Sequence, residues 1–256
     1  MRAGALRLPG RMWRARVRSG RLAFCAMMAG VFGAAVAAQS LPEGPVEWAQ
    51  FADPTTRYPH GVLGDDIEHG ALQIKYASQP TPITLHLPEN RVFEDVAPRL
   101  VDLDADGQAE VIVVESHQQQ GARLAIYDGA GLIAATPYIG QRFRWLAPIG
   151  AADLNGDGAI EIAYIDRPHL AKTLRIWRYR DGSLTEAASL RGLTNHKIGE
   201  PDIAGGIRTC NGRSDMIVAD SDWRRIVAVS FHDNRLATRD LATHRGRDSF
   251  AAAMAC

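Results

Sequence analysis

The stretch DLDADGQAEVIVV, residues 102–114, and the stretch DLNGDGAIEIAYI, residues 153–165, can be laid over each other without a gap. In both, oxygen-bearing side chains alternate through a tight turn, a Glu follows, and a run rich in apolar residues comes next. Such a run favours a β-strand. The offset of 51 residues leaves room for about four strands, so the two stretches predict one repeated supersecondary unit.

Turn signals keep the same register as these two stretches. An Asp-Gly hairpin signal follows each of them, at residues 128–129 and 181–182. The same spacing recurs more weakly at residues 71–90 and 215–234, where a β-rich run precedes a polar turn. Four copies therefore cover about residues 60–243, and no part of that stretch shows a sustained helical period.

Four-stranded units of this length stack as blades, because no single unit can bury both of its faces alone. We therefore predict an all-β protein, a small β-propeller of about four four-stranded blades with calcium-binding loops. A fifth blade is the alternative, assembled from the leader around residues 46–51 and the C-terminal tail. A β-sandwich would also be all-β. It would not require the β-rich run and the turn signal after it to keep the same spacing in four copies.

The turns at residues 102–110 and 153–161 have the composition of cation sites. Each offers side-chain oxygens at positions 1, 3, 5 and 9, a main-chain carbonyl at position 7, and a Gly at position 6 that lets the backbone reverse. Oxygen-only ligands select Ca²⁺ rather than Zn²⁺ or copper. The alternative is a solvated acidic turn, in which the carboxylates would repel one another. The predicted ligands of two Ca²⁺ sites are Asp102, Asp104, Asp106, the Gln108 carbonyl and Glu110, and then Asp153, Asn155, Asp157, the Ala159 carbonyl and Glu161.

An EF-hand opens with the same letters but requires a Glu at position 12 and a helix on each side. Position 12 is Val113 in the first loop and Tyr164 in the second. Both residues lie in the apolar runs that favour strands, so the sequence excludes an EF-hand.

The two stretches resemble FG-GAP/VCBS repeats, which build the integrin-α-type β-propeller and occur in many exported bacterial proteins. The resemblance is close in these two units and weaker in the other two. It implies one structural Ca²⁺ for each intact loop, and adhesion or ligand binding more often than catalysis. Integrin-type propellers have more than four blades, so the unit count departs from that pattern.

Residues 1–38 have the layout of a secretory signal. They contain seven arginines and no acid, then an apolar run at residues 22–36, which is short for a membrane span, and a small-residue cleavage site. A mitochondrial transit peptide is the alternative. The predicted organisation is a signal peptide (1–38), a leader (39–58), the propeller (59–245) and a tail (246–256), in a secreted or periplasmic protein with no stable membrane insertion after cleavage.

Charge and cysteine content limit the partners and the covalent links of the exported chain. Lys+Arg and Asp+Glu are both 29 in the whole chain, so removing the signal leaves 22 basic and 29 acidic residues, which argues against a nucleic-acid partner. Cys210 and Cys256 remain, and an oxidising compartment predicts a disulfide between them. Cys210 stands where the fourth unit has lost its metal ligands. The alternative is a buried Cys210 and a free Cys256.

Two functions follow from the motifs. The first is a non-catalytic, Ca²⁺-stabilised propeller that binds a protein or glycan ligand. The second is a propeller hydrolase or lyase in which His196, Glu200 or Asp202 carries out acid–base chemistry in the central channel. No nucleophile elbow, P-loop or dinucleotide fingerprint occurs in the sequence, and no nucleophile–base pair can be recognised, which favours binding.

Overall fold

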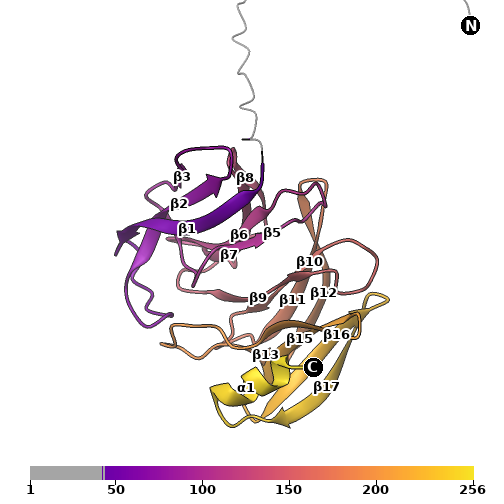
Figure 1. The fold of residues 1–256 in the computed structure, drawn as a ribbon. Helices are drawn as coiled ribbons and strands as arrows, with labels where there is room; N and C mark the ends of the chain where they lie inside the picture. The colour runs from indigo at the N-terminus through magenta and orange to yellow at the C-terminus, as the bar shows by residue number, and fades with distance from the viewer. Residues whose placement is uncertain (1–41, 43) are drawn as a thin grey trace, which may run out of the picture. The chain divides into compact units, whose positions relative to one another are not determined.

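The computed structural model describes residue 42 and residues 44–256, which lie in the second of two units that divide between Ala38 and Gln39. The predicted signal peptide and the first residues of the leader lie outside the described residues. The described part of the chain contains 17 strands, all paired antiparallel, and one short helix (Figure 1). The all-β prediction is confirmed.

The first sheet joins two strand units. In the first unit β2 lies between β1 and β3; in the second, β4 and β5 lie end to end along β6, followed by β7 and β8. The single pair His69–Phe93 connects the two units. The strands are β1 (Val46–Thr55), β2 (Glu68–Tyr76), β3 (Ile83–His86), β4 (Arg91–Phe93), β5 (Arg99–Val101), β6 (Glu110–His117), β7 (Gly121–Asp128) and β8 (Gly131–Ala135).

The second and third sheets repeat the second unit. The second is a simple meander of β9 (Leu146–Ala152), β10 (Glu161–Asp166), β11 (Thr173–Arg180) and β12 (Ser183–Arg191). In the third, β13 (Leu193–Thr194) and β14 (Gly206–Cys210) both pair with β15 (Arg213–Asp220), and β16 (Arg225–His232) and β17 (Arg235–Thr243) follow. The helix α1 (Arg247–Met254) is the last element of the described chain, and no described helix is long and apolar enough to cross a membrane.

The first unit differs from the predicted repeat. It has three strands, because residues 91–93 form β4 and pair along β6 of the next unit. Val92 and Phe93 are buried, and Phe93 joins the core layer between the two units. Burial of this aromatic ring therefore accounts for the place of β4.

Alternating side chains of the central strands explain how the sheets stack. In β6, Val111 and Val113 pack toward β2, whereas Ile112 and Val114 pack toward the second sheet. β10 and β15 show the same alternation, so each of these strands is buried on both faces. Figure 1 shows the resulting order, from β1–β3 at one end through β9–β12 to β16, β17 and α1 at the other.

The two end faces of the stack are covered in different ways. At the first end Gln50 donates to Gln73 Oε1 at 2.8 Å, and Trp48, which pairs with Lys75, is 37% exposed. At the other end Phe250 and Ala253 of α1 pack against Ile217 and Ile226. β1 therefore belongs to the first sheet and the tail forms a helix, so among the described residues these segments do not combine into a fifth sheet.

A disulfide ties the tail to the third sheet in the structure. It joins Cys210, the last residue of β14, to Cys256, with 5.7 Å between the Cα atoms. Arg208 of the same strand donates to the Ala253 carbonyl at 2.6 Å. These contacts hold α1 over the outer face of the third sheet.

Candidate functional site

The first acidic loop connects β5 to β6 and gathers three carboxylates. One oxygen from each of Asp102, Asp104 and Asp106 lies within 4.8 Å of the others; Asp104 and Asp106 are exposed and Asp102 is half-buried. The backbone orients two of them: Gly107 N–H donates to Asp102 Oδ2 at 3.1 Å and Gln108 N–H donates to Asp106 Oδ1 at 2.7 Å. Gly107 adopts a φ of 88°, which a residue with a side chain rarely adopts.

Two buried oxygens of this loop have no hydrogen-bond partner among the described residues, Asp102 Oδ1 and the side-chain Oε1 of Gln108. A buried acceptor without a donor costs about 1–3 kcal/mol. Burial raises the pKa of Glu110, and the nearby charges of Asp104 and Asp106 raise it further. A hard cation would neutralise the excess negative charge and give the unpartnered carboxylate oxygen a partner. The residues of this loop therefore suit the Ca²⁺ that the resemblance implies.

The second acidic loop connects β9 to β10 and satisfies more of its oxygens internally. Asp153 accepts the N–H groups of Gly156 at 2.7 Å and Gly158 at 2.9 Å, while Asn155 Nδ2 donates to Asp157 Oδ2 at 2.9 Å. The described residues hold one cluster of three convergent acidic ligands, and it is in the first loop. In the second loop Asn155 takes the place of the middle aspartate, and among the described residues its acids do not form such a cluster.

Arg178 accounts for much of the difference between the two loops. It pairs across the strands with Glu161, and its Nη2 lies 2.7 Å from Glu161 Oε1 and 3.1 Å from Asp157 Oδ2. One guanidinium thus neutralises two predicted Ca²⁺ ligands. In the first loop Tyr127 pairs with Val111 and is followed by Asp128, so an acid stands near the matching position.

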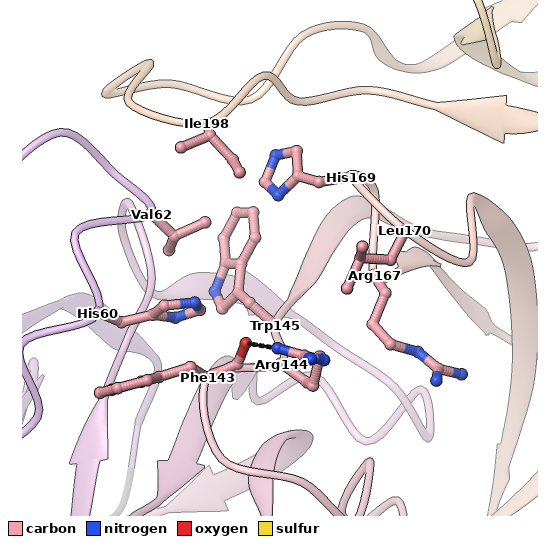
Figure 2. A pocket seen from close by; sticks show the side chains of 9 residues that line it. All are labelled: His60, Val62, Phe143, Arg144, Trp145, Arg167, His169, Leu170 and Ile198. Carbon is pink, nitrogen blue, oxygen red and sulfur yellow. Dashed lines mark hydrogen bonds between the residues drawn. The ribbon is translucent and has the colours of Figure 1, made fainter.

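A cavity of about 400 Å³ opens at the other end of β9 and β10 (Figure 2). Six residue pairs join these two strands, which corresponds to about 20 Å along them. All of the lining residues come from connections between strands: His60 and Val62 between β1 and β2, residues 143–145 before β9, residues 167, 169 and 170 after β10, and Ile198 between β13 and β14. The cavity and the second acidic loop therefore lie at opposite ends of one hairpin.

A buried carboxylate positions His60 at the cavity. His60 Nδ1 lies 2.5 Å from Glu94 Oε1, and Glu94 is fully buried. Glu94 Oε2 also accepts the hydroxyl of Ser116, and its main-chain carbonyl accepts Trp145 Nε1 at 2.8 Å. Burial raises the pKa of Glu94, whereas the bond to His60 lowers it. In Figure 2, His60 lies on one side of Trp145 and His169 on the other.

His196 is buried behind the cavity, with both ring nitrogens engaged. Its Nδ1 lies 3.0 Å from His169 Nε2, and its Nε2 lies 2.8 Å from the Glu200 carbonyl. Glu200 and Asp202 instead pair with Arg247 of α1, at 2.8 and 2.6 Å. The structure therefore does not assemble the predicted His196, Glu200 and Asp202 group as an open acid–base site.

Sequence reasoning missed the cavity residues. His60 and Glu94 are 34 positions apart, and His169 and His196 are 27 apart, so no local motif marks them. The signal would have to be the burial of a lone Glu, which depends on neighbours from other strands.

Comparison with known proteins identifies the region around both acidic loops. The family described as FG-GAP-like repeat matches residues 102–164. This chain carries an FG-GAP-like repeat. The FG-GAP-like repeat includes both acidic loops and the Phe143–Trp145 segment of the cavity, so one repeat contributes to both ends of the β9–β10 hairpin.

Solved structures and curated proteins give weaker matches. The exotype rhamnogalacturonan lyase YesX aligns at 14% identity and a TM-score of 0.46, over 77% of this chain and 47% of that one. A Bacillus licheniformis rhamnogalacturonan lyase aligns at 15% identity and a TM-score of 0.37, over 70% of this chain and 43% of that one. This chain spans less than half of each enzyme, and neither activity transfers to it at these values. None of the curated proteins compared is significantly similar.

Proposed function

We propose that this chain is an exported, Ca²⁺-stabilised, non-catalytic β-propeller protein that binds a glycan in the cavity between its loops, with a protein ligand as the alternative. The observation that carries the proposal is the cavity itself, which is lined entirely by connections and supported by three stacked sheets. Loops on a rigid scaffold are where proteins place binding residues. A volume of about 400 Å³ lies in the usual range for small-molecule sites.

Calcium has a structural role in this proposal. At the first loop Asp102, Asp104, Asp106 and Glu110 would hold the ion, with the Gln108 carbonyl as a further ligand. At the second loop Arg178 must first release its two carboxylates, so we propose that this site binds Ca²⁺ more weakly. Since about 20 Å of strand separates the second loop from the cavity, an ion there supports the scaffold and does not touch the ligand.

A hydrolase or lyase is the second candidate, and the pairing of His60 with buried Glu94 is the observation that favours it. A histidine backed by a carboxylate can act as a general base or acid. This pair would replace the His196, Glu200 and Asp202 group that the sequence indicates.

A glycan array probed with the exported protein tests the proposal, followed by an assay for new reducing or unsaturated ends on every glycan that binds. Binding without product supports the proposal, and product formation that is lost in His60→Ala favours the enzyme. If no glycan binds but a protein partner does, the alternative ligand stands. If neither binds, the proposed function is wrong.

A further inference from the structure

The cavity is basic in a chain whose exported part is acidic. Among the described residues its lining includes two arginines and two histidines and no aspartate or glutamate. Residues 39–256, by contrast, hold 22 basic and 29 acidic residues. A concave site with one sign of charge concentrates ligands of the opposite sign.

Arg144 is the cation of the lining that remains available. Arg167 is held by Asp166 through Nε and Nη2, at 2.8 and 2.9 Å. Arg144 donates from Nη1 to the Phe143 carbonyl at 2.9 Å and has no carboxylate partner among the described residues. A half-buried guanidinium that faces a cavity without a counterion is suited to a carboxylate, which it can bind through two parallel hydrogen bonds.

His169 presents a hydrogen-bond acceptor, as the chain of contacts behind it shows. A carbonyl only accepts, so the Glu200 carbonyl requires the proton of His196 on Nε2. Neutral His196 then accepts at Nδ1 from His169 Nε2–H, which leaves the lone pair of His169 on Nδ1. Burial lowers the pKa of His169 to about 4 and lowers the pKa of His196 as well, which keeps both rings neutral near pH 7.

The remaining contacts define the other parts of the ligand. His60 uses Nδ1 for Glu94, which leaves Nε2 for the cavity. Leu170 and Ile198 line the same cavity and are 63% and 70% exposed, although both are aliphatic. The ligand thus needs a negative group, a hydroxyl that can donate, and an apolar face.

We propose that the cavity binds an acidic sugar, a uronic acid residue of a glycan, with its carboxylate on Arg144 and a ring hydroxyl donating to His169 Nδ1. The C–H face of the sugar packs against Leu170 and Ile198. The proposal rests on the glycan-binding function proposed above and adds the class of sugar.

Isothermal titration of the exported protein tests it with five probes: trimers of galacturonic acid, glucuronic acid, galactose and glucose, and acetate as the anion alone. At least one acidic trimer should bind about tenfold or more tightly than its neutral counterpart. Arg144→Gln should remove that difference, and Arg144→Lys should keep part of it, because the charge remains without the two-pronged geometry. The matched control is Arg235→Gln, which removes the same charge from an exposed position on β17 and should change nothing.

The outcomes separate this inference from the proposed function. Equal binding of acidic and neutral trimers overturns the acidic-sugar assignment while glycan binding stands. Binding of acetate but of no trimer, or the absence of all binding, overturns the acidic-sugar assignment, and the glycan array then decides whether the proposed glycan binding stands. Circular dichroism shows whether Arg144→Gln folds. If it does not, Arg144→Lys decides. If this variant binds the acidic trimer as tightly as the wild type does, with the same preference over the neutral trimer and acetate, the role of Arg144 is overturned.

Discussion

Calcium should stabilise this protein through the first acidic loop before the second, and Asp102→Asn separates the two. Extracellular Ca²⁺ modules bind at about 10⁻⁴ to 10⁻³ M. With a dissociation constant of about 1 mM, 10 mM Ca²⁺ adds about 1.4 kcal/mol to the free energy of unfolding. A domain of this size moves about 2–4 °C per kcal/mol, so the melting temperature should rise by about 3–6 °C.

Without calcium, Asp102→Asn should not lower the melting temperature. Among the described residues Asp102 Oδ1 has no hydrogen-bond partner, and it stands beside two other carboxylates, so Asp102→Asn should relieve repulsion and leave the calcium-free melting temperature equal or higher. It should also abolish most of the Ca²⁺-induced rise. If Asp102 only capped the turn through its bond from Gly107, the variant would instead melt lower with and without the ion.

The second loop provides a matched comparison. Arg178→Gln leaves the buried Glu161 without its guanidinium, which should lower stability without Ca²⁺ by about 3–5 kcal/mol. It also frees two ligands, so the Ca²⁺-induced rise should become larger than in the wild type. Differential scanning fluorimetry with EDTA, Ca²⁺ or Mg²⁺ measures each shift. An equal rise in the wild type and Asp102→Asn, or an equal rise with Mg²⁺, would refute the reasoning.

Three further predictions concern stability. Cys210→Ser with Cys256→Ser opens a loop of 46 residues and should cost about 2–4 kcal/mol in denaturant unfolding, whereas free thiols in non-reducing peptide maps of the exported protein would rule the bridge out. Glu115→Gln leaves two partly buried arginines without their counterion and should cost about 3–5 kcal/mol at pH 7. The Tyr127 hydrogen bond, the Arg123 charge and the Tyr138 hydrogen bond lower the pKa of Glu115 despite its burial, so the cost should shrink as the pH falls below the unfolded pKa of 4.5, and a cost that is independent of pH would contradict this. Burial, reinforced by the Glu94 charge, raises the pKa of Glu68 to about 10, so the folded state holds a proton that the unfolded state loses above about pH 4.5. Wild-type stability should therefore fall as the pH rises from 5 to 9, and Glu68→Gln should flatten that fall; equal slopes in urea titrations would speak against it.

The acidic loops could be predicted because all their ligands lie within nine consecutive residues. Spacing around the turn, set by Gly107 and Gly158, fixes which side chains can converge, and the apolar run that follows marks the strand. The FG-GAP-like repeat was recognisable for the same reason. Local sequence did not reveal that Arg178 covers two ligands of the second loop, because strand pairing brings it across from Glu161.

The amino-acid sequence by itself determined the all-β class, the repeat and the two acidic turns, since each of these depends on short-range spacing and alternation. Tertiary structure decided the rest. Stacking of the three sheets places α1 over the outer face of the third sheet and buries His196. Glu200 and Asp202 form ion pairs with Arg247 of that helix. It also brought His60, Arg144 and His169 to one cavity from three separate connections. Their contacts depend on which strand ends meet in space, and the pairing and packing of whole sheets set that.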